Sequence, residues 1–290
     1  MTRLVRAELL KIRRRQATYV LFVILLILTA VVFIAGGRFW TISGLVSFPQ
    51  AYATFFFQTI YQLGSLIAIV FAAAYVGADW NWGVLRTIVA RGEGRERYLV
   101  AKFIALAIVL AIALLVMFAA GFVLTFLQSV LYGIPMASPL RADGLQDLVV
   151  WIVVGFPVLL QRAAIGFAVA AIFRSQLAGA VVGIVLFLVE SVLTTILTLL
   201  SATSGLGSGI GNGLDSGIQP VGPEWFQFLP VTIGGNVLGA LPGGGGLDST
   251  DLSSILLKPV PFSIAMACVL LYLVVALAIA LIALRRQEIA

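Results

Sequence analysis

Long apolar runs separated by short polar segments make up most of the chain. Six runs approach or reach the roughly 20 residues that a helix needs to cross a bilayer. They cover about residues 17–35, 55–76, 103–127, 148–173, 177–200 and 262–284. A spanning segment must satisfy its own backbone hydrogen bonds in lipid, so runs of this length form helices. The pattern therefore predicts an all-α membrane protein with six transmembrane helices, forming a single transmembrane domain over residues 1–290.

The first polar segment, residues 1–16, has a helical pattern of its own. At 100° per residue, Val5, Leu9 and Ile12 fall on one stripe, and the basic side chains fall elsewhere. This pattern is typical of an N-terminal interfacial helix that lies among the headgroups of the membrane lipid. A solvated charged tail is the alternative. The first apolar run has no obvious cleavage site, so we expect it to be retained as a span.

The outer loop, residues 201–261, is the longest polar excursion and precedes the last run. Residues 201–217 are rich in Gly and Ser, which predicts a mobile stretch. Residues 231–241 are apolar but too short to span, and glycines interrupt them. We therefore expect an outer re-entrant or interfacial hairpin before the last span, closed by the flexible turn Gly243–Gly246.

A charged island, residues 79–102, lies between the second and third runs. Helical phasing separates an apolar face from a polar face over Asp79–Arg91, and Gly92 and Gly94 end that pattern. The apolar face consists of Val84, Leu85, Ile88 and Val89. We expect a short amphipathic helix that docks on a partner; the alternative is a loop whose arginines only set topology. Asp79, near its start, either favours the positive helix terminus or caps it.

Composition and charge narrow the class of protein. Hydrophobic residues make up 61% of the chain and charged residues 10%, against about 25% charged in soluble domains. The net charge of +6 does not indicate nucleic-acid binding, because the basic residues flank apolar runs. Most of the 18 Lys and Arg residues fall on one side of the expected spans. By the positive-inside rule, both termini and the island are cytoplasmic in a multi-pass protein of the cell membrane.

The sequence shows no pattern of residues that is typical of a catalytic site. The chain has no histidine and one cysteine, Cys268, and no metal-ligand spacing or nucleophile–base pair can be identified. It also lacks the Gly-x-x-x-x-Gly-Lys-Ser/Thr loop that cradles nucleotide phosphates. We therefore expect neither an enzyme nor a cofactor bound by this chain.

Two ionisable residues lie inside expected spans. Arg162 lies about 18 Å and Glu190 about 24 Å along their helices from Arg174, at 1.5 Å per residue. If the fourth and fifth spans are neighbours, the two form an intramembrane polar pair, which costs far less than two isolated charges. Such a pair either fixes helix packing or lines a polar substrate path.

The island and the N-terminus resemble the ABC-2-type transporter permeases. The similarity rests on Asp-Trp-Asn-Trp-Gly-Val-Leu-Arg-Thr from Asp79, on Arg-Gly-Glu-Gly-Arg-Glu-Arg-Tyr from Arg91, and on the entry segment Leu4–Arg14. Val84 departs from the threonine frequent in that family. The resemblance implies a permease paired with a second copy or a paralogue, and cytoplasmic ATPase subunits that supply ATP and Mg²⁺. The ATPase-coupling residues that it implies are Asp79, Trp80, Trp82, Gly83, Leu85, Arg86 and Arg91.

Three functions follow from these patterns. The first is the permease subunit of an ATP-driven exporter. The second is a non-transporting scaffold or anchor subunit of a larger membrane complex, which also needs a docking helix. The third is a membrane enzyme that uses the intramembrane pair and the outer acidic residues Asp143, Asp147, Asp215 and Glu224.

Overall fold

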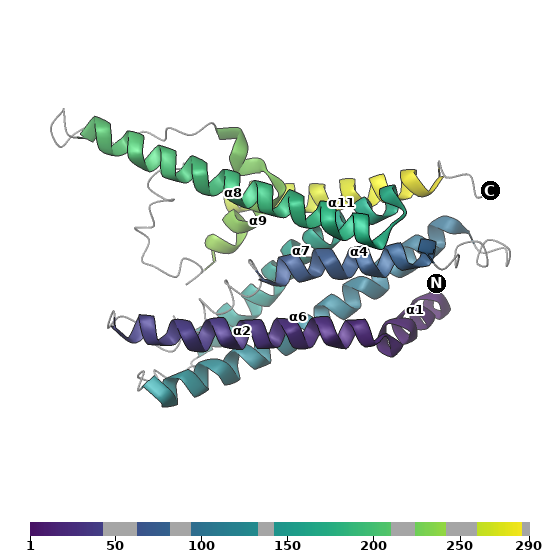
Figure 1. The fold of residues 1–290 in the computed structure, drawn as a ribbon, viewed down its shortest axis with the longest axis horizontal. Coiled ribbons are helices and arrows are strands. Elements are labelled where there is room, and N and C mark those ends of the chain that lie inside the picture. Colours follow the sequence, from purple (N-terminus) through teal and green to yellow (C-terminus); the bar gives the residue numbers. More distant parts are fainter. Residues whose placement is uncertain (43–62, 82–93, 133–141, 210–223, 242–259, 286–290) are drawn as a thin grey trace.

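The computed structural model describes residues 1–42, 63–81, 94–132, 142–209, 224–241 and 260–285. Within these ranges the chain is helical and contains no strand. Figure 1 shows the helices as an elongated bundle. In chain order they are α1 (Thr2–Arg14), α2 (Gln16–Ile42), α4 (Ser65–Asn81), α6 (Arg95–Tyr132), α7 (Ala142–Phe173), α8 (Gln176–Gly209), the 3-10 helix η2 (Glu224–Phe228), α9 (Pro230–Gly239) and α11 (Phe262–Arg285).

Four of these helices, α6, α7, α8 and α11, are long and apolar enough to cross a membrane. A fifth candidate is the pair α1 and α2, which is bent by 65° between Arg14 and Gln16. Helix α4 is apolar but shorter, with 17 residues, or about 25 Å at the usual helical rise. The chain is thus an all-helical protein whose helices are compatible with a multi-pass membrane protein. Residues 55–62 of the expected second span lie outside the described ranges.

Several helices run beyond the bounds that hydropathy predicts, and α4 and α8 are the two that bear on the site. Helix α4 continues past Val76 to Asn81, and Asp79 in its last turn has buried partners in the bundle. Helix α8 continues to Gly209, through residues 201–209 that we assigned to a mobile loop. Gly and Ser are poor helix formers in water. At the edge of a bilayer, however, the cost of an unpaired backbone favours continuing the helix.

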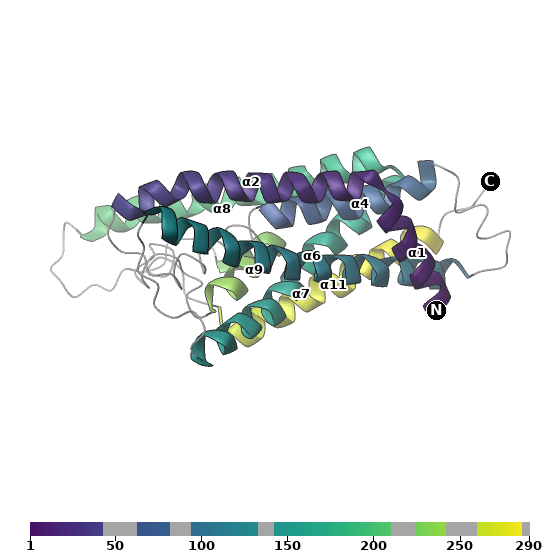
Figure 2. The same ribbon diagram turned by 90° about the horizontal axis from the view of Figure 1, so that it is seen from below.

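Helix α7 is the centre of the bundle. It packs most extensively on α4 and α11, and then on α8, whereas α1 and α2 pack mainly on α6. Figure 2, turned by 90° about the horizontal axis, shows α2 running along α6 and α7 crossing toward α11. The inner face of α7 is built of small and apolar side chains, among them Ala163, Ala164 and Phe167, none of them exposed. This central position explains why Gln161 and Arg162 of α7 have protein partners.

Glycines bring the backbones of α4, α7 and α8 into direct contact. A Cβ added to Gly166 would lie 2.4 Å from the backbone oxygen of Ile69, and one added to Gly179 would lie 2.6 Å from the Cβ of Ala170. Small residues at helix interfaces permit this close approach in membranes. The turn between α7 and α8 is equally tight, with Arg174 in the left-handed region at φ 53°. These three helices therefore form a closely packed unit.

Candidate functional site

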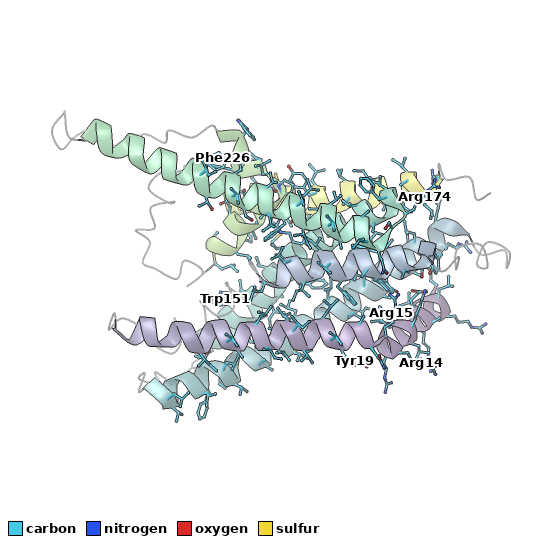
Figure 3. All side chains as sticks on the ribbon, in the orientation of Figure 1. Arg14, Arg15, Tyr19, Trp151, Arg174 and Phe226 are labelled. Atoms are coloured by element: carbon cyan, nitrogen blue, oxygen red, sulfur yellow. The ribbon has the colours of Figure 1, made fainter. Side chains whose placement is uncertain are left out.

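Most of the charged side chains that the structure describes gather at one end of the bundle, which we call the basic end. Helix α1, the end of α11 and the α7–α8 turn lie there (Figure 1). In Figure 3, Arg14, Arg15 and Arg174 are labelled at this end, whereas Trp151 and Phe226 lie in the opposite half. The exposed face of α1 carries the side chains of Arg3, Arg6, Arg13 and Arg14.

The inner face of α1 packs on the protein. Ile12 is only 2% exposed, and Val5 and Leu9 contact the same hydrophobic core. Helix α6 is the main neighbour of α1. The apolar stripe expected from the sequence is therefore confirmed, and it contacts a protein helix. Whether the basic face lies among lipid headgroups stays a prediction.

A buried group of six polar side chains, the ionic cluster, joins α1 to α4 and α6. Each helix contributes two residues, three or four positions apart, so that both side chains point to the same side. The members are Glu8, Lys11, Tyr75, Asp79, Tyr98 and Lys102. All but Lys11 are classed as buried, and Lys102 and Asp79 are each 1% exposed. The ionic cluster is thus an internal feature of the fold.

Asp79 is the centre of the ionic cluster. Its Oδ1 accepts a hydrogen bond of 2.6 Å from the Nζ of Lys11. Its Oδ2 forms an ion pair with Lys102 and accepts a hydrogen bond from the hydroxyl of Tyr98. One carboxylate therefore binds α1 through Lys11 and binds the start of α6 through the other two residues.

Glu8 is the second carboxylate of the ionic cluster. The hydroxyl of Tyr75 donates to its Oε2 at 2.5 Å, and the hydroxyl of Tyr98 donates to its Oε1 at 3.3 Å. The ammonium of Lys11 lies 3.6 Å from Glu8 Oε1, and that of Lys102 lies 3.8 Å from Oε2. Lys102 also lies over the Tyr75 ring, 4.3 Å from its centroid, in a cation–π contact. Two lysines balance two carboxylates, which is the condition for burying such charges at acceptable cost.

The position of Asp79 corrects one sequence prediction. We expected it near the start of an amphipathic helix, but it lies in the last turn of α4. The buried lysine at the start of α6 holds it inside the bundle and extends α4. Trp80 also belongs to α4, although its side chain is not described. The other predicted coupling residues lie outside the described ranges: Trp82, Gly83, Leu85, Arg86 and Arg91.

The ionic cluster fixes both ends of the segment that carries those residues. Asp79 precedes residues 82–93, and Tyr98 and Lys102 follow them. The Asp79 contacts therefore pin the end of α4 to the start of α6 at the base of this segment.

Sequence analysis missed five of the six cluster members as site residues. The available signal was the spacing of polar residues beside apolar runs: Glu8 with Lys11, and Tyr98 with Lys102. Same-face spacing indicates that two side chains of one helix can share a partner. It does not identify that partner, which lies 67 to 90 positions away for the contacts of Glu8 with the two tyrosines.

Arg162 and Glu190, the expected intramembrane pair, both bind the start of α9. The guanidinium of Arg162 donates to the carbonyl oxygens of Pro230 and Val231. Glu190 Oε1 accepts hydrogen bonds from the N–H of Val231 and, at 2.8 Å, from the N–H of Thr232. We call this arrangement the α9 clamp.

The α9 clamp satisfies backbone groups that a membrane cannot satisfy. The first N–H groups of a helix have no partner within it, and unpaired groups are costly in lipid. A carboxylate there also interacts favourably with the positive helix terminus. Gln161 and Tyr272 complete the arrangement by donating to the carbonyls of Pro230, at 3.0 Å, and of Phe228, at 2.8 Å. The two charges thus hold α9 against α7 and α8.

Gly234 makes room for the α9 clamp. A Cβ at this position would lie 2.6 Å from Nη2 of Arg162 and 2.9 Å from Val158. Arg162 itself is fully buried, with 0% of its surface exposed. The glycines that interrupt residues 231–241 therefore have a packing reason at this position.

Most of the side chains on which the enzyme hypothesis depends are not described by the structure. The side chains of Asp143, Asp147 and Glu224 are not described, and Asp215 lies outside the described ranges. Among the described residues, no group of three potential ligands could hold a metal ion. Cys268 is half-buried in α11 with a free thiol.

Comparison with known families identifies one relationship. The chain belongs to the family described as "Protein of unknown function (DUF2705)", whose model matches residues 44–206, more than half of the chain. The match includes Asp79 and Lys102 of the ionic cluster and both charges of the α9 clamp. A comparison with curated proteins finds no match.

Proposed function

We propose that this chain is the permease subunit of an ATP-driven exporter of the ABC-2 type. The observation that carries the proposal is the ionic cluster at the base of residues 82–93. It links the two ends of that segment to each other and to α1 through buried charges. An ATPase that docks on the segment would move three helices of the bundle at once.

The proposal requires a firm connection between the docking segment and the bundle. An ordinary surface loop moves without displacing the helices it connects, because loops have few packing contacts. Here the side chains of Asp79 and Lys102, each 1% exposed, close the base of the segment. Breaking a buried ion pair of this kind by removing one partner costs about 3–5 kcal/mol. The segment is therefore joined to the helices through charges that are costly to leave unpaired.

The rest of the proposed assembly follows from the sequence pattern, which gives the topology, and from the resemblance to the permease family, which gives the partners. The bundle has six spans, with α4 completing the second, and both termini and residues 82–93 are in the cytoplasm. Partner ATPase subunits bind ATP and Mg²⁺, and a second copy or a paralogue completes the path. Nucleotide binding and hydrolysis in the partners drive alternating access. The α9 segment is a re-entrant hairpin before the last span.

The test is a charge reversal in the docking segment, Arg86→Glu with Arg91→Glu. We expect the double variant to insert normally but to lose stimulation of the partner ATPase by the permease. The matched control is Arg13→Glu with Arg14→Glu, the same charge change on the exposed face of α1 at the same end of the bundle. The measurement is ATP hydrolysis by the co-purified complex in lipid nanodiscs.

The same preparation separates the exporter from the scaffold. Purification with other membrane subunits and no ATPase would favour the scaffold hypothesis. A stoichiometric ATPase whose activity is unchanged by the Arg86 and Arg91 reversals would show that the docking assignment is wrong. A neighbouring reading frame that encodes an ATPase would independently support the exporter.

A further inference from the structure

The helices of this chain divide into two packed halves. The first half consists of α1, α2 and α6, because both α1 and α2 pack mainly on α6. The second half consists of α4, α7, α8, α9 and α11, which pack extensively on one another around α7. Contacts across the boundary, which we call the seam, are much sparser: α6 contacts α7, α11 and α4 only lightly, and α2 contacts α4 lightly.

The helices of the second half are held together by close backbone contacts and by buried hydrogen bonds. The glycine contacts between α4, α7 and α8 all lie within it, including Gly166 against Ile69 and Gly179 against Ala170. The α9 clamp also lies within it, because Arg162, Glu190 and Tyr272 belong to α7, α8 and α11. Backbones in direct contact and buried charge–backbone hydrogen bonds leave this half little freedom to deform.

Two sets of polar contacts between described residues cross the seam, and both lie at the basic end. They are the contacts of α4 with α1 and α6 in the ionic cluster, and the exposed ion pair of Glu96 with Arg285. The rings of Phe103 and Phe167 meet edge-to-face one position farther along α6, with centroids 5.4 Å apart. Figure 1 shows α2 and α6 well below α8 at the end of the bundle away from the termini. The ion pairs described across the seam therefore join it at the basic end, while Leu110 and Leu114 of α6 share an apolar core with Trp151 of α7 farther along.

We propose that the ionic cluster is the hinge between the two halves, which move as rigid bodies about it. Its buried contacts hold the halves together at the basic end. The four charges and two hydroxyls hold α1 and α6 against α4 in the closed arrangement. Loss of one charge frees the halves to separate while each half stays intact. The inference deepens the proposed function, because residues 82–93 leave the second half at α4 and enter the first at α6. It names the movement that docking of an ATPase would drive, and its test needs no ATPase.

The experiment measures distances between spin labels in the full chain in lipid nanodiscs. Cys268→Ser removes the sole cysteine, so labels attach only where cysteines are introduced. The seam pair carries labels at Val31 of α2 and Val192 of α8, which are 58% and 56% exposed. The control pair carries labels at Val192 and at Val274 of α11, which is 59% exposed, both within the second half. Unlabelled protein is added in excess, so that distances within one copy dominate.

Lys102→Met breaks the ionic cluster with a side chain of similar length. We expect it to broaden the distance distribution of the seam pair, or to add a second peak, and to leave the control pair unchanged. Adding Asp79→Asn to this variant should not narrow the distribution, because the remaining Glu8–Lys11 pair at 3.6 Å lies within α1 and does not cross the seam. Glu96→Gln, which removes the exposed ion pair across the seam, should leave both pairs unchanged.

Tyr98→Phe provides a milder variant should Lys102→Met fail to fold. It removes the hydroxyl that donates to Asp79 and lies 3.3 Å from Glu8, and it keeps all four charges. A seam distribution that stays unchanged in the folded variants would overturn the proposal, and so would equal broadening of the seam and control pairs. If the seam opens but no ATPase associates with the chain, the exporter assignment fails and the hinge stands.

Discussion

Asp79→Asn is the sharpest test of the ionic cluster as a stabilising element. The substitution keeps the size of the side chain and removes its charge. It leaves two lysines with one carboxylate inside the protein, where Lys102 is 1% exposed. Glu96→Gln is the matched control: the same carboxylate-to-amide change, at an ion pair with Arg285 whose side chains are 54% and 67% exposed.

The expected cost follows from the geometry of the ionic cluster. Removing one partner of a buried ion pair destabilises a protein by about 3–5 kcal/mol. Glu8 stays within 3.6 Å of one lysine and 3.8 Å of the other, which places the loss near the lower value, about 3 kcal/mol. With about 2–4 °C per kcal/mol for a chain of this size class, the midpoint of thermal unfolding falls by on the order of 10 °C. The exposed control should show no measurable change, because water screens its charges.

The assay uses the sole cysteine of the chain. Cys268 is half-buried in α11, so a thiol-reactive fluorogenic dye reports its exposure as the bundle unfolds on heating. Asp79→Asn, Glu96→Gln and the parent are heated in the same detergent. Equal midpoints for the two variants would refute the argument that buried charges stabilise the junction of α1, α4 and α6. A second check is Asp79→Asn with Lys102→Met, which should recover part of the loss.

Three further predictions concern the second half of the bundle. Gly166→Ala should lower the unfolding midpoint strongly, because its Cβ would meet a backbone oxygen of α4 at 2.4 Å; Gly239→Ala, with open space around the Cβ, should leave the midpoint unchanged or raise it. Gly234→Ala should displace the Arg162 guanidinium and admit a membrane-impermeant thiol reagent to cysteines placed on α9, measured by labelling of intact cells. Glu190→Gln should lower the yield of assembled complex and leave transport per assembled complex unchanged; reduced transport at normal assembly would instead support a polar substrate path.

Hydropathy predicted much of the fold, because a helix that crosses lipid must be apolar and about 20 residues long. The expected spans at 103–127, 148–173 and 262–284 lie within α6, α7 and α11. The short apolar stretch at 231–241 overlaps α9, and Arg162 and Glu190 do come to the same place. What the sequence could not indicate is that their immediate partners are backbone groups of α9. Charge alone identifies a need for a partner and not its identity.

The ionic cluster was harder to predict for a related reason. Its members lie at the ends of three helices that are distant in the chain, and each looks like an ordinary polar residue beside a span. Asp79 was noticed because it opens the charged island, and it was placed on the wrong helix. Only the packing of α1 on α6 and of α6 beside α4 brings Lys11, Lys102 and Asp79 together.

The α9 clamp also constrains the order in which this chain can be made. Arg162 is synthesised 68 positions before the first carbonyl that it binds, and Glu190 is synthesised 41 positions before its first backbone partner. During synthesis, both charges are therefore made before the segment that binds them. The α7–α8 hairpin must persist in that interval as a pair of closely packed helices. Its tight turn and glycine contacts supply the stability for an intermediate that is completed only when α9 arrives.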